Sequence, residues 1–143
     1  MNEAHFHRLE RMYAAAPFNT YYRGQLEVSQ DHARLTLPIQ ESFMHAAGAV
    51  HGTHYFKLLD DSCFFAAQSR VTEVFLLTAS FNLYFTRPIV GKSMVGEAKL
   101  VSRTARQLIA EGVVLDDQGR ECGRGSGVFA LTRIPLDEKI GYA

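Results

Sequence analysis

The chain has 143 residues, of which 47% are hydrophobic and 21% are charged. This length and composition predict one globular domain over residues 1–143 with a sizeable core, and they exclude a disordered chain. The 15 basic and 15 acidic side chains balance. No basic run alternates with aromatic residues, so the sequence lacks the phosphate-neutralising surface that nucleic-acid binding needs.

Membrane and metal partners are equally disfavoured by the sequence. The apolar stretches are broken by charges well short of the roughly 18 to 20 residues that span a bilayer, and the N-terminal residues include acids and no apolar signal segment. Cys63 and Cys122 stand at no metal-ligand spacing and are typical of reduced thiols. We expect a cytoplasmic protein without a metal, in which His5, His7 and His32 are solvated.

The N-terminal third predicts one helix and two strands. Apolar residues recur at three- and four-residue intervals over residues 3–14, which indicates a short amphipathic helix ended by Pro17. Tyr22–Ser29 and Arg34–Gln40 are predicted strands, joined at Gln30–Asp31 as a hairpin.

A long helix over Thr53–Gln68 and four further strands are predicted next. Short turns between the last strands favour antiparallel neighbours, so the fold class is α+β. The simplest packing is a curved antiparallel sheet of about six strands wrapped around the long central helix. The four strands are expected at residues 75–89, 94–103, 107–115 and 121–133.

The strand expected at residues 75–89 alternates apolar and polar side chains. Leu77 and Phe81 belong to the apolar set, and Thr78 belongs to the polar set. The alternation predicts that Leu77 faces the core and that Thr78 faces away from it.

The long helix carries two adjacent carboxylates with different surroundings. Asp61 follows Lys57 by four residues, so the two side chains can pair on a polar surface stripe. Asp60 lies about 100° away around the helix, among apolar neighbours such as Phe56 and Phe64. A carboxylate in such surroundings must be paired, neutralised or used chemically. The complete polar stripe is His54, Lys57, Asp61 and Gln68.

The segment before this helix resembles a known family motif. The run His45-Ala-Ala-Gly48-Ala-Val-His51-Gly52-Thr53, followed by Asp60, is similar to the Asn-x-x-Gly-x-x-His-Gly-Gly pattern and distal Asp of PaaI-like acyl-CoA thioesterases, which have the hotdog fold. The run from Asn82 to Pro88 resembles the family strand that ends in Pro. Two positions differ, because Thr53 replaces the second Gly of the turn and His45 replaces the Asn. Thr53 then either faces the thioester or caps the helix.

The resemblance implies roles for individual residues. Asp60 would act as general base or nucleophile, with a pKa raised by its apolar neighbours, and the Gly52 N–H would hold the oxyanion. His45 and Thr78 would polarise the carbonyl or position water. The carboxylate and the His-Gly turn would come from different subunits, which implies a homodimer at minimum, with a homotetramer as the favoured larger assembly. The resemblance also implies that a coenzyme A thioester is the substrate and that no cofactor is needed. The substrate-binding candidates are His51, Thr53, Phe56, Asn82, Arg87, Arg124 and Ser126.

Other interpretations stay open on the sequence alone. His51 can serve only to hold the turn, and the Gly-rich segment at 123–127 can serve only to allow a bulge or close subunit packing. A non-catalytic acyl-CoA-binding or regulatory hotdog protein is the main alternative function. A hotdog dehydratase is disfavoured, because no His-Phe-Pro-Gly-like run occurs. The sequence does not distinguish medium fatty acyl groups from phenylacetyl-like groups.

Overall fold

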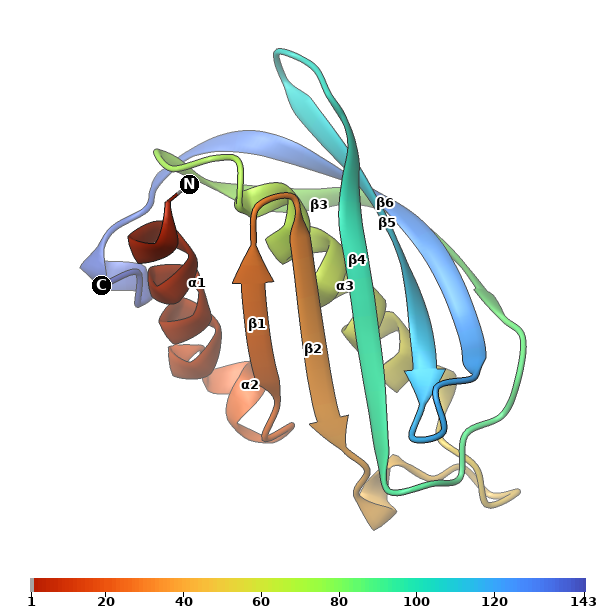
Figure 1. The fold of residues 1–143 in the computed structure, drawn as a ribbon. Coiled ribbons are helices and arrows are strands. Elements are labelled where there is room, and N and C mark those ends of the chain that lie inside the picture. Colours follow the sequence, from red (N-terminus) through yellow and green to blue (C-terminus); the bar gives the residue numbers. More distant parts are fainter. Residues whose placement is uncertain (1) are drawn as a thin grey trace.

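A six-stranded antiparallel sheet curves around one long helix, α3 (Gly52–Gln68), in the computed structural model, which describes residues 2–143 (Figure 1). The order of the strands across the sheet is β1-β2-β4-β5-β6-β3. This confirms the predicted α+β hotdog arrangement. The strands are β1 (Gln25–Ser29), β2 (His32–Pro38), β3 (Val74–Phe85), β4 (Ser93–Arg103), β5 (Gln107–Asp116) and β6 (Glu121–Pro135).

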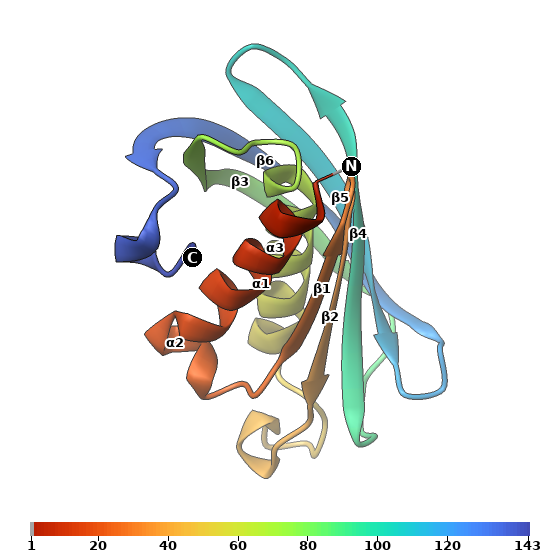
Figure 2. The ribbon, with the colours of Figure 1, turned by 60° about the vertical axis from the view of Figure 1, so that its left-hand side comes forward.

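Two N-terminal helices pack on the same side of the sheet as α3 (Figure 2). The predicted first helix is confirmed as α1 (Glu3–Ala15), which buries its apolar stripe. Pro17 lacks an N–H and has a fixed φ, so it ends α1 and opens the short helix α2 (Pro17–Thr20). The three-residue helices η1 (Glu41–Phe43) and η2 (Glu138–Ile140) complete the helical elements of the described chain.

The first hairpin forms where it is predicted. Asp31 has a φ of 63° and turns the chain between β1 and β2. Strand β1 begins later than expected, because Arg23 has a φ of 53°, a left-handed conformation that does not continue a strand.

Strand β3 contains a bulge that reverses its two faces. The register against β6 shifts between Thr78 and Ser80. Before the bulge, Leu76 is fully buried and Thr78 points at α3, whereas Leu77 is 50% exposed. After the bulge, Phe81 packs on α3, so its predicted core position is correct. The predictions for Leu77 and Thr78 are wrong, because one extra residue on the bulged strand shifts the alternation by one position.

Glycines let the sheet approach α3 closely. A Cβ at Gly96 would lie 2.7 Å from the carbonyl oxygen of Leu58 in α3, and a Cβ at Gly127 would lie 2.6 Å from the ring of Phe81. The first contact brings β4 close to α3 and the second brings β6 close to β3, whereas close packing between subunits through the Gly-rich segment of β6 stays a prediction.

Two polar side chains expected at the surface are buried. Gln68 is fully buried at the end of α3, where its amide donates to the carbonyls of Val71 and Val74 and accepts from the Leu76 N–H. His5 is 1% exposed and bonds to the Gln68 carbonyl oxygen and to the hydroxyl of Tyr142. The solvated positions predicted for both are wrong, because α1 and the C-terminal segment cover this end of α3. Within residues 2–143, no helix has the length and apolar character needed to span a membrane.

Candidate active site

Asp60 lies on the face of α3 that meets β3. The bulge aims Thr78 at it, and the Thr78 hydroxyl donates to Asp60 Oδ1 at 2.8 Å. Burial raises the pKa of Asp60 above its ordinary value, although the Thr78 hydrogen bond and the nearby Lys57 charge partly oppose the rise. The predicted direction of this pKa shift therefore agrees with the structure. We call Asp60 and Thr78 the acid half-site.

Asp61 is paired with Lys57 as predicted, but the pair is buried. Lys57 Nζ lies 2.7 Å from Asp61 Oδ2, and the two side chains are only 10% and 16% exposed. The ammonium also contacts the Asn19 side-chain oxygen and lies 4.7 Å from the centre of the Phe18 ring. Burial raises the pKa of Asp61 to about 6 despite this partner. The predicted surface position of Asp61 is wrong, because α1 and α2 cover this face of α3.

The turn before α3 is built around His51. Its ring Nδ1 accepts the Thr53 N–H at 3.0 Å, so His51 caps the helix and Thr53 does not. Gly52 is the first residue of α3, and its N–H makes no hydrogen bond within residues 2–143. A Cβ at Gly52 would lie 2.8 Å from the Phe85 ring. Glycine at this position therefore allows the Phe85 ring to pack against the helix start.

His45 and Arg87 lie beside Gly52. They line a depression of about 500 Å³ together with Phe85. His45 is exposed, and its Nδ1 accepts the Ala47 N–H at 3.1 Å. We call His45, Gly52 and Arg87 the turn half-site. The structure thus brings together His45 and Gly52, which the sequence proposed for catalysis, and Arg87, which it proposed for substrate binding.

The two half-sites are separate within one chain. Asp60 follows Gly52 by eight residues, and a helical rise of 1.5 Å per residue places them about 12 Å apart along α3. Phe56 lies between them, 39% exposed and packed edge-on against Phe81. One chain therefore cannot present the Asp60 carboxylate and the Gly52 N–H to the same carbonyl group.

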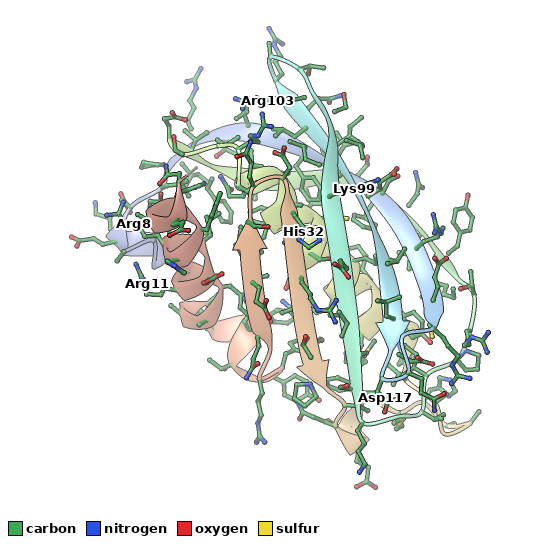
Figure 3. All side chains as sticks on the ribbon, viewed as in Figure 1. Arg8, Arg11, His32, Lys99, Arg103 and Asp117 are labelled. Carbon is green, nitrogen blue, oxygen red and sulfur yellow. The ribbon has the colours of Figure 1, made fainter. Side chains whose placement is uncertain are left out.

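Asn82, Arg124 and Ser126 lie elsewhere. They line a shallow depression on the face of the sheet that is turned away from α3, together with His32 and Lys99, which Figure 3 labels. Arg124 forms a two-pronged ion pair with Glu121, at 2.7 and 2.8 Å. Within one chain this depression shares no lining residue with the spaces beside the two half-sites, and CoA binding by these residues stays a prediction.

An apolar cavity of 410 Å³ opens beside the acid half-site. Sequence reasoning did not find its walls, because they come from distant segments. The amphipathic pattern of residues 3–14 signalled that α1 packs on the domain, but nothing in the sequence indicated that the C-terminal segment would join it. Besides Asp60 and Thr78, the lining residues include Met12, Tyr13, Phe64, Phe65, Phe75, Leu77, Ile134 and Ile140.

Two other kinds of reactive group in the described chain are the cysteines and the metal-ligating side chains. Cys63 and Cys122 are unpaired and buried, and burial raises the pKa of both thiols, so neither is an available thiolate. Among residues 2–143, no three His, Cys, Asp or Glu side chains are grouped to hold a metal ion.

A sequence model of the thioesterase superfamily matches residues 47–123, which is more than half of the chain. The chain belongs to the thioesterase superfamily. The matched region contains Gly52 and Arg87 of the turn half-site, all of α3 and Thr78, and it begins two residues after His45. Among curated proteins, no sequence matches this thioesterase-superfamily chain.

Solved structures share the fold of this superfamily member at low sequence identity. The PaaI protein of E. coli, from the phenylacetic acid degradation operon, superposes with a TM-score of 0.83 at 14% identity, over 92% of this chain and 95% of PaaI. A phenylacetic acid degradation-related protein of Ralstonia eutropha gives 0.78 at 20% identity, over 88% and 98%. An esterase candidate from Mycobacterium tuberculosis gives 0.76 at 24%, over 82% and 97%. The PaaI-like hotdog fold is thereby confirmed.

Proposed function

We propose that this thioesterase-superfamily protein hydrolyses acyl-CoA thioesters to a free acid and CoA, with Asp60 as general base or nucleophile. One observation carries the proposal. A carboxylate with a raised pKa, oriented by Thr78, lies in the wall of an apolar cavity. A carboxylate whose pKa is shifted toward the working pH is suited to proton transfer, and the apolar cavity suits an acyl group.

The residues can perform the reaction in two ways. As a base, Asp60 takes a proton from water while the water oxygen bonds to the thioester carbon. As a nucleophile, Asp60 bonds to that carbon and forms an anhydride, which water then hydrolyses. In both routes the C–S bond breaks, and CoA leaves as a thiolate that takes up a proton. Because Thr78 donates to Oδ1, the carboxylate is held in one orientation. The Gly52 N–H, at the positive end of the α3 dipole, stabilises negative charge on the carbonyl oxygen.

A second copy of the chain would join the half-sites. Strand β3 is at one end of the sheet, and its outer edge has no strand partner within residues 2–143. The acid half-site lies at the Thr78 end of this strand and the turn half-site lies at the Phe85 end. If two copies of β3 pair antiparallel about a two-fold axis, the Thr78 end of one strand lies beside the Phe85 end of the other. The exposed side chains of Leu77, Tyr84 and Phe85 would be covered by this pairing.

The decisive variant is Asp60→Asn. We expect kcat/KM on a panel of acyl-CoAs to fall by at least about 100-fold, the lower range for loss of a general base. Asp117→Asn is the matched control, because Asp117 is an exposed carboxylate at the β5–β6 turn (Figure 3). Unchanged turnover in Asp60→Asn would rule out the mechanism. Binding of acyl-CoA by the wild-type protein without release of thiol would instead favour a non-catalytic acyl-CoA-binding protein.

Mixed dimers test whether the site is shared. Asp60→Asn and Gly52→Ala subunits, carrying different tags, are co-expressed and the mixed dimer is purified. One of its two sites then contains both defects and the other contains neither. We expect activity near half that of the wild-type dimer, well above either parent variant. Activity no higher than that of the parents would place the complete site within one subunit.

A further inference from the structure

The cavity beside Asp60 has mainly apolar and aromatic walls. Helix α3 contributes Phe64 and Phe65, strand β3 contributes Phe75, and α1 contributes Met12 and Tyr13. Its volume of 410 Å³ is in the range of small-molecule pockets. A space of this size and polarity suits a hydrocarbon chain or an aryl ring.

The polar groups of the cavity argue against a charged ligand. Its ionisable acidic lining groups are Asp60 and Asp61, and no Lys or Arg is among its described lining residues. Lys57, which is the nearest cation along α3, is held by Asp61 at 2.7 Å. An acyl group with a carboxylate at its far end would meet negative charge without a partner, so an uncharged acyl group is favoured.

The C-terminal segment forms the outer wall. Ile134 and Ile140 contribute to the lining, and the chain beyond them ends beside α1. The Tyr142 hydroxyl bonds to His5 Nδ1 at 2.7 Å, and Arg11 Nε donates to the Ala143 carbonyl oxygen at 2.6 Å. Arg8 and Arg11 extend from α1 toward this segment in Figure 3. We call residues 134–143 the C-terminal strap.

We propose that the cavity beside Asp60 holds an uncharged acyl chain longer than acetyl, and that the C-terminal strap limits its length. This inference rests on the proposed thioesterase function, because the acid half-site and the cavity share Asp60 and Thr78. A thioester carbonyl at Asp60 would place its acyl group at the cavity opening. Ile140 would then contact the far part of the chain, and its side-chain volume would determine chain-length preference.

The test uses S-alkyl-CoA thioethers, which cannot be hydrolysed, with ethyl, hexyl and decyl chains, and measures binding by calorimetry. In the wild-type protein, each buried methylene should tighten binding roughly fourfold, since its burial is worth about 0.8 kcal/mol. Ile140→Trp should abolish this gain for the longer chains and leave ethyl-CoA binding within about twofold. Val101→Trp is the matched control, because Val101 is an exposed apolar residue of β4 outside the cavity. It should behave as wild type.

A second variant covers the case in which Ile140→Trp does not fold. Ile140→Ala enlarges the cavity and should shift both binding and hydrolysis toward longer chains. Wild-type affinity that is independent of chain length, or equal chain-length profiles in wild type and the Ile140 variants, would overturn the acyl-pocket assignment. Length-dependent thioether binding by a protein that releases no thiol from any acyl-CoA would support the pocket and overturn the proposed hydrolysis.

Discussion

Removal of the Lys57 charge should destabilise the protein strongly, because it leaves the Asp61 carboxylate buried without a partner. In Lys57→Met the side-chain length is nearly kept, but the contact at 2.7 Å and the cation–π contacts with Phe18, Tyr22 and Tyr13 are lost. Breaking a buried ion pair from one side costs about 3–5 kcal/mol, and both side chains here are below one-fifth exposed. We expect the free energy of unfolding to fall by about 3 kcal/mol near neutral pH.

Removal of both charges should cost much less than removal of one. In Lys57→Met/Asp61→Asn no charge is buried at this position, so we expect a loss of about 1 kcal/mol relative to wild type. Urea unfolding of the wild type, both single variants and the double variant gives the coupling energy of the pair. All four proteins are measured at one concentration, because association would shift their apparent stability.

The pH dependence has a definite sign. The pKa of Asp61 in the folded protein is about 6, above its unfolded value, so the folded state binds this proton more tightly than the unfolded state does. Protonation of Asp61 therefore stabilises the folded protein as pH falls. Lys57 lowers this pKa, so its removal raises the pKa further. The loss in Lys57→Met should therefore be largest above the raised pKa of the variant and should shrink as pH is lowered from there to about 6, the pKa of Asp61 in the wild type. A coupled buried pair would be refuted if the losses of unfolding free energy in the two single variants added up to the loss in the double variant and did not change with pH.

Two further perturbations test the acid half-site and the C-terminal end of α3. In Thr78→Val the hydroxyl that holds Asp60 is lost, and because this hydroxyl lowers the Asp60 pKa in the wild type, the pKa should rise. We expect kcat to fall about tenfold and, since Asp60 must be ionised, the acidic limb of the pH–rate profile to move to higher pH. Thr78→Ser keeps the hydroxyl and should leave both kcat and the limb near wild type. Gln68→Leu removes three hydrogen bonds, two that join α3 to Val74 and Leu76 of β3 and one to Val71 in the segment between them. It should lower the free energy of unfolding by about 2–4 kcal/mol in thermal denaturation, without moving the acidic limb of the pH–rate profile. An unshifted limb in Thr78→Val, or a fully stable Gln68→Leu, would contradict these assignments.

The sequence predicted the elements and the sheet arrangement because periodicity reports local structure. The 3.6-residue pattern placed α3 within one residue of its observed start, and turn residues such as Asp31 marked the first hairpin. The bulge in β3 was not predicted. A bulge depends on how β3 pairs with β6, and the alternation from Leu77 onward contains no sign of the extra residue.

The two adjacent carboxylates show what helical geometry can and cannot settle. The 100° rotation per residue correctly placed Asp60 and Asp61 on different faces of α3, with Asp60 toward β3. It did not show which neighbour covers each face. Because α1 and α2 lie over the Lys57 side, Asp61 is the less accessible acid and carries the pKa near 6. Asp61→Asn is therefore a perturbation of stability, and a distant carboxylate such as Asp117 is the better control for catalysis.

The spacing between Gly52 and Asp60 links the motif to assembly. Eight residues of helix separate the two by about 12 Å, whereas a donor and a base that act on one carbonyl group must both lie within hydrogen-bond reach of the reacting atoms. Helix α3 is regular over this span and Phe56 lies between the two positions, so a shift within one chain does not close the gap. In the proposed dimer a second chain would close it by antiparallel pairing of β3, one of the two edge strands of the described sheet. The proposed shared site therefore predicts that a strictly monomeric variant is inactive, and activity of such a variant would contradict it.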